Sequence, residues 1–308
     1  MASDSGEQSV PGWKCLARYL GIILTVACVV YVGWELRASG SVLAEAIWTP
    51  RSLMAIGLSA VLWIGLNALL GLGWGSLIKA MGNRVALGDA VTLSMLTQAG
   101  KYLPGNVFHL AGRVWLAGKF GIERKLAALA TAGEMGLLVF VAIVIGLPWL
   151  LQHVAVPWLG IALGGLIVLA LLALAGVWFK KNRDRAQLGP VMRGPGFISW
   201  LFLSIAAYSS VFLIQFAMFE IISWSQPLDW GLNRGGALQI VTITWLAGFV
   251  VIGSPGGLGV REAAFAVFAL NEGMRVELLL VAALMRVASV IGDLGSLGVG
   301  TLVQRGRG

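Results

Sequence analysis

Two short proline-glycine segments contain the residue types in this sequence that could bind a ligand. The first is Lys101-Tyr102-Leu103-Pro104-Gly105-Asn106, the second is Gly253-Ser254-Pro255-Gly256-Gly257, and an arginine soon follows each. A guanidinium can bind a phosphate through two parallel hydrogen bonds, and glycine lets backbone amides approach a ligand closely. We therefore expect a site for an anionic headgroup, above all a lipid phosphate. The candidate binding residues are Lys101, Pro104, Gly105, Asn106, His109 and Arg113 in the first part of the chain, and Pro255, Gly256, Gly257, Gly259, Arg261 and Glu262 in the second.

These segments also have an interpretation that needs no ligand. Proline-glycine turns serve as plain loops between helices, and arginines at a membrane interface often extend to headgroups without further function. The two prolines lie about 150 residues apart, one in each half of the chain. Paired breaks in corresponding places point to the substrate site of a transporter, so the pair favours the binding interpretation.

Three further ionisable residues, Glu134, Arg286 and Asp293, lie inside apolar stretches. Charges at such depth are costly and normally face a partner or a water-filled cavity. Two pairings are reasonable: Glu134 with Arg286, or Arg286 with Asp293 through water. Either would be a structural tie or a gating element. Glu262, directly after Arg261, could be the local counter-charge of that arginine.

The elements that would position these residues are membrane helices. Hydrophobic residues make up 58% of the chain and charged residues 12%, and the mean hydropathy is +0.87. A soluble domain has about 25% charged residues. The sequence therefore predicts an all-α polytopic membrane protein, with residues 1–308 as a single membrane domain. The expected apolar segments are 16–34, 52–78, 88–112, 126–147, 157–179, 197–223, 236–270 and 277–302.

The order of these segments predicts an internal repeat, with halves 13–147 and 157–302. Segments 88–112 and 236–270 contain the two breaks, and we expect each to be a re-entrant hairpin of two half-helices. The other six are expected to cross the membrane fully. This arrangement places most loop lysines and arginines on the cytoplasmic side, together with both termini. Each half then has three crossings, so the second half is inverted relative to the first, as in many carriers.

Motifs for other classes of function are missing from the sequence. It has no nucleotide-binding Gly-Lys-Ser/Thr loop, no His-Glu-x-x-His, no Cys-x-x-Cys and no Gly-x-Ser-x-Gly, and only two histidines. We therefore expect no enzymatic activity, no metal and no cofactor. The net charge of +8 comes from basic residues in short loops rather than from one soluble basic face, so we expect no nucleic acid partner.

The stretches Gly100-Lys101-Tyr102-Leu103-Pro104-Gly105-Asn106, with Arg113 after it, and Pro255-Gly256-Gly257-Leu258-Gly259-Val260-Arg261-Glu262 resemble the two signature stretches of the lysylphosphatidylglycerol synthase transmembrane family. That family includes the flippase portion of the bacterial multiple-peptide-resistance proteins. The resemblance covers nearly the whole chain in length and segment order. It implies a protein that moves or handles a lipid-linked molecule between leaflets, with Lys101, Arg113, Arg261 and Glu262 as functional positions. A stand-alone member is expected, without the soluble aminoacyltransferase domain of the synthases.

Two functions from different classes remain open. The first is a carrier or flippase for an anionic lipid or a lipid-linked sugar. The second is a non-transporting membrane scaffold for a glycosyltransferase or another envelope-synthesis enzyme, which would dock at the basic cytoplasmic loop 180–196. For both we expect a multi-pass protein of a bacterial or archaeal plasma membrane.

Overall fold

The computed structural model describes residues 49–102, 107–153, 196–226, 234–251, 255–269 and 272–306. Within these ranges the chain is helical and has no strand, which confirms the predicted all-α class. The predicted spans 16–34 and 157–179 lie outside the described residues, and so does nearly all of the basic loop 180–196.

Four helices are long and apolar enough to cross a membrane: α3 (Pro50–Ala80), α6 (Arg124–His153), α9 (Phe197–Ser225) and α12 (Glu272–Arg305). They coincide with the second, fourth, sixth and eighth predicted segments. Large apolar side chains also face outward from them, with Ile198 80% exposed and Phe202 71% exposed. A surface of this kind is stable against lipid rather than water. The chain is therefore a multi-pass membrane protein.

The third and seventh predicted segments are each divided into two α-helices. In the first half, α4 (Leu87–Thr97) and the 3-10 turn η1 (Gln98–Tyr102) precede α5 (Phe108–Ala117). In the second half, α10 (Arg234–Val250) and η3 (Pro255–Gly257) precede α11 (Val260–Val267). Gly256, Gly257 and Gly259 have φ angles of 60°, 74° and 79°. L-residues with side chains rarely adopt such angles, so glycine is needed where this helix is interrupted.

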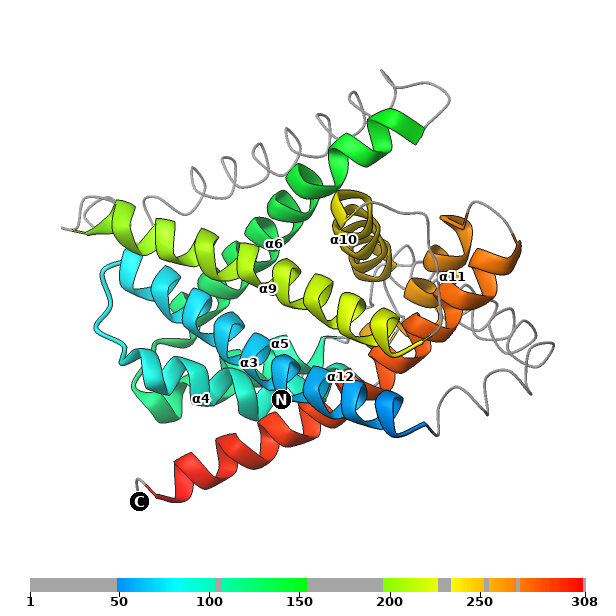
Figure 1. The fold of residues 1–308 in the computed structure, drawn as a ribbon. Helices are drawn as coiled ribbons and strands as arrows, with labels where there is room; N and C mark the ends of the chain where they lie inside the picture. The colour runs from blue at the N-terminus through cyan, green and yellow to red at the C-terminus, as the bar shows by residue number, and fades with distance from the viewer. Residues whose placement is uncertain are drawn as a thin grey trace, which may run out of the picture.

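Helices α3 and α9 lie side by side and pack extensively against each other (Figure 1). Helix α3 also packs against α4 and α12. Its contact with α4 depends on Gly71, where an added Cβ would lie 2.6 Å from the Cα of Val91. Small residues allow this close approach of two membrane helices. At its N-terminus, α3 is capped by Thr49, whose side chain accepts a hydrogen bond of 3.1 Å from the backbone N–H of Ser52.

The same order of elements occurs in both halves: a long helix, two shorter helices and a second long helix. Contacts between the halves occur in matching sets, since α4 packs on α12, α10 packs on α6, and η1 contacts η3. The interrupted parts of the two halves therefore meet inside the molecule, although they are far apart in the sequence. The inversion of one half relative to the other remains a prediction.

Candidate functional site

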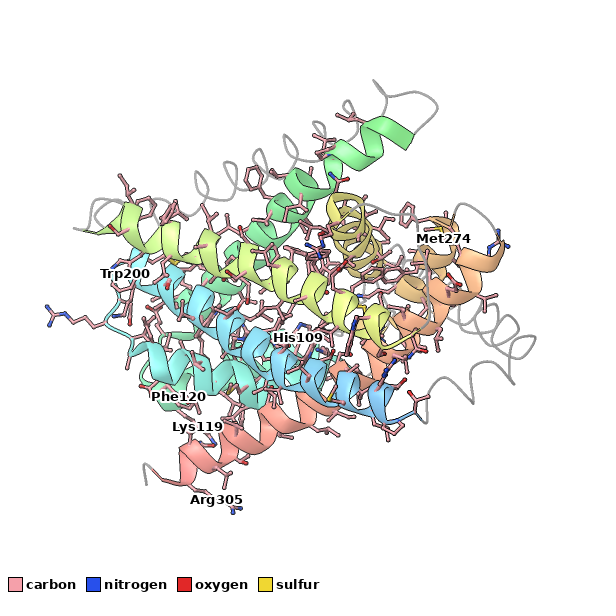
Figure 2. All side chains as sticks on the ribbon, viewed as in Figure 1. His109, Lys119, Phe120, Trp200, Met274 and Arg305 are labelled. Atoms are coloured by element: carbon pink, nitrogen blue, oxygen red, sulfur yellow. The ribbon has the colours of Figure 1, made fainter. Side chains whose placement is uncertain are left out.

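A cavity of about 120 Å³ lies where the two interrupted segments meet. Lys101, His109 and Arg113 line it from the first segment, and Gly256, Gly257 and Arg261 line it from the second. Figure 2 shows His109 in the middle of the helix bundle, whereas Arg305 lies at its periphery. The structure thus brings together the described residues that flank the two predicted breaks. Pro104, Gly105 and Asn106 lie outside the described residues.

Arg113, on α5, forms a buried ion pair with Glu134 on α6. Its Nη1 donates to Oε2 of Glu134 at 2.6 Å, and each side chain is only 1% exposed. Nη2 of Arg113 also donates to Oγ of Ser94 at 3.2 Å, and the guanidinium lies over the ring of Trp74. A buried charge with a close counter-charge and additional contacts is fixed in place. Arg113 is therefore held against α6 and is not a free cation of the cavity.

Lys101 and Asp293 form the centre of a second polar cluster. Nζ of Lys101 lies 2.7 Å from Oδ2 of Asp293, which also accepts a hydrogen bond from the hydroxyl of Tyr102. The other carboxylate oxygen accepts from Nε1 of Trp63 at 2.8 Å and from Nδ2 of Asn67 at 2.9 Å. The carboxylate therefore connects α12 to α3 and η1, and it neutralises the lysine nearest the first break.

Arg286, on α12, binds the second interrupted segment at two points. Its Nε donates to Oε1 of Glu262 at 3.0 Å, and its Nη1 donates to the carbonyl oxygen of Gly256 at 2.9 Å. Helix α11 thus resembles α5 in being joined to the following long helix by an ion pair. The sense of charge is reversed, because the arginine lies on α5 in one half and on α12 in the other.

Arg261 differs from the other three cations because it forms no ion pair with any residue of the described ranges. Its guanidinium lies 5.9 Å from the ring centre of Trp245, and its Nε is buried without an acceptor. The side chain runs over two glycines. A Cβ added to Gly248 would lie 2.5 Å from its Cγ, and one added to Gly257 would lie 3.0 Å from its Nε. These glycines leave the space that the arginine fills.

Glu134 and Arg286 have other ion-pair partners than each other in the structure. The water-mediated link between Arg286 and Asp293 stays a prediction. Glu134 binds Arg113, Arg286 binds Glu262, and Asp293 binds Lys101. Glu262 is accordingly the ion-pair partner of Arg286, although Arg261 is its neighbour in the chain. The reason is geometric: α5 packs on α6 and α11 packs on α12, so each charge meets the nearest neighbouring helix.

Other residues of the cavity were not among the predicted site residues. Trp63 and Trp245 form aromatic parts of its wall, and Gln215 on α9 lines it while only 3% exposed. Tyr102 does not line the cavity, but its hydroxyl binds Asp293 in the neighbouring polar cluster. A polar side chain in the middle of an apolar span, such as Gln215, was the one sequence signal that could have identified the wall.

His109 lines the cavity, and its Nδ1 is buried without a hydrogen-bond partner among the described residues. Among the residues that the structure describes, no group of three or more histidine, cysteine or acidic side chains could hold a metal ion.

Comparison of the chain with protein-family models and with curated proteins finds no match. The resemblance to the lysylphosphatidylglycerol synthase transmembrane family therefore rests on the two short motifs and on the order of apolar segments.

Proposed function

We propose that this chain is a membrane carrier, a flippase, that moves an anionic lipid or a lipid-linked sugar between leaflets. The observation that supports this proposal best is the meeting of both interrupted segments at one cavity. This cavity contains an arginine, Arg261, that has no carboxylate partner among the described residues. Helix breaks inside a bilayer are tolerated where they are buried in protein or line a cavity. In carriers they commonly form the substrate site.

The architecture that goes with this function has six full spans and two re-entrant hairpins in an inverted repeat. Contacts between α4 and α5, and between α10 and α11, are compatible with two half-helices that fold back on each other. In this proposal the protein lies in a bacterial or archaeal plasma membrane with both termini in the cytoplasm. The motif resemblance to the flippase family supports the same assignment.

The ion pairs suggest which cation would contact the phosphate first. Arg113 could bind a phosphate only after giving up Glu134, and Lys101 only after giving up Asp293. Arg261 has no such competitor among the described residues, so we assign the first contact with the phosphate to Arg261. The three ion pairs then hold the half-helices in one of two arrangements, and their rearrangement would accompany movement of the lipid.

The direct test is reconstitution into liposomes that contain fluorescent lipids with different headgroups, followed by measurement of leaflet exchange. We expect exchange of at least one anionic lipid, and strong loss of this activity with Arg261→Met. Arg84→Met is the matched control, because Arg84 is exposed and does not line the cavity. Absence of exchange from well-folded protein for every anionic lipid and lipid-linked sugar would refute the carrier and favour the scaffold that docks a glycosyltransferase.

A further inference from the structure

The charges around the cavity leave a single positive charge uncompensated. Four cations lie there among the described residues, Lys101, Arg113, Arg261 and Arg286. Three carboxylates bind three of them, and Arg261 is left over. A net charge in a low-dielectric site is costly, and a ligand of opposite charge removes this cost.

Hydrogen-bond donors without acceptors converge on the same place. A second, smaller cavity of about 40 Å³ adjoins the first, and Gln215, Arg261 and Arg286 line both. Nε2 of Gln215, Nε of Arg261 and Nη2 of Arg286 are all buried without a hydrogen-bond partner. Buried donors of this kind are rare in native proteins and call for a partner that the protein alone does not supply. An anionic oxygen group would satisfy all three.

Acceptors without donors border the same space. Glu134 lines the larger cavity and Glu262 lines the smaller one. One oxygen of each carboxylate is engaged in its ion pair, and the other, Oε1 of Glu134 and Oε2 of Glu262, is buried without a partner. Ionised carboxylates only accept hydrogen bonds, so a hydroxyl group would suit these positions.

We propose that the ligand of this site is a phosphodiester with one negative charge and a hydroxyl-bearing headgroup, bound by Arg261, Gln215 and Arg286. The inference rests on the proposed carrier function and narrows its substrate class. A phosphomonoester brings a second negative charge that no free cation of the described residues would neutralise. A zwitterion leaves the positive charge of Arg261 uncompensated. A cavity of about 120 Å³ has room for a phosphate group with a small polyol and some water.

The test measures binding to purified protein in neutral detergent, with short-chain lipids that differ only in the headgroup. Dihexanoyl phosphatidylglycerol carries one charge and two hydroxyls, and we expect it to bind best. Dihexanoyl phosphatidylmethanol, with the charge but without hydroxyls, should bind about 5- to 30-fold more weakly. Phosphatidic acid and phosphatidylcholine of the same chain length should bind at least about 10-fold more weakly. Equal or tighter binding of either would overturn the inference.

Three variants locate the site. Arg261→Met should weaken binding of the phosphatidylglycerol probe about 30-fold or more, because a charge-assisted contact is lost. Gln215→Glu places a carboxylate in the cavities that Arg261 also lines, and it should exclude the anion at unchanged side-chain size. Arg84→Met should bind like the unaltered protein. Circular dichroism and melting temperature show which variants are folded. Unaltered affinity in a folded Arg261→Met or Gln215→Glu protein would contradict the assigned binding site. If Arg261→Met does not fold, Gln215→Glu alone tests the site.

Free sn-glycero-3-phosphoglycerol separates a lipid ligand from a soluble one. Competition at similar concentrations would assign the site to a soluble diester, whereas a requirement for the acyl chains would assign it to a lipid. Binding without leaflet exchange would leave this site standing while the carrier function fails. Leaflet exchange that depends neither on headgroup charge nor on Arg261 would support the carrier function and contradict the proposed binding site.

Discussion

Arg113 shows how strongly one buried charge constrains this protein. The type of residue and its position after the first break favour a phosphate ligand, yet the structure gives it Glu134, Ser94 and the ring of Trp74 as partners. A guanidinium that is already satisfied gains little from a ligand. Arg261, with the same chemistry and no counter-charge among the described residues, is the more suitable cation.

The Arg113–Glu134 pair predicts a strongly non-additive pair of substitutions. Arg113→Met and Glu134→Gln should each lower stability by about 3–5 kcal/mol, because each leaves an uncompensated buried charge or an unsatisfied buried partner. The double variant should recover much of this loss. Thermal unfolding in detergent measures the cycle. Simple addition of the two effects would mean that the ion pair does not contribute to the folded state.

Helices α5 and α11 are short, with 10 and 8 residues, and neither could be stable alone in water. Each is tied to the next long helix by an ion pair, α5 to α6 through Arg113 and Glu134, and α11 to α12 through Glu262 and Arg286. The reversed sense of charge means that neither half repeats the other residue by residue.

The close α3–α4 contact can be tested with a matched pair of glycines on α3. An added Cβ at Gly71 would meet the backbone of Val91 at 2.6 Å, whereas one at Gly65 on the same helix would meet nothing within 4 Å. Gly71→Ala should destabilise the protein by about 1–3 kcal/mol through overpacking. Gly65→Ala should be neutral or slightly stabilising, because alanine favours the helix. Thermal unfolding of both variants tests this, and equal effects would contradict the close packing.

Gly71→Ala should also affect binding through Ser94, which lies on α4 and accepts a hydrogen bond from Arg113. Displacement of α4 would disturb this contact at the cavity wall. Weaker binding of the phosphatidylglycerol probe by Gly71→Ala than by Gly65→Ala is therefore expected in the folded proteins.

The complete molecule makes a prediction about sidedness. If α4 and α5 form a re-entrant hairpin, the chain returns to the side of the membrane from which it entered. Single cysteines introduced at Lys79 and near Arg124, which lie before and after the hairpin, should then react with an impermeant reagent from the same face. Labelling from opposite faces would show that this segment crosses the membrane, and it would contradict the predicted inverted repeat.

Composition and local pattern were sufficient to predict the membrane class, the four long helices of the described ranges and the two places where a helix is interrupted. These properties depend on a run of neighbouring residues, since a span requires about 20 consecutive apolar residues and proline or glycine interrupts a helix locally. The partners of the charges could not be obtained in this way. Asp293 meets Lys101, 192 positions earlier in the chain, only because α12 packs beside α3 and η1. The uncompensated positive charge of Arg261 depends on the same packing. Among the described residues, the helix contacts pair the other three cations of the cavity with carboxylates and leave Arg261 without one.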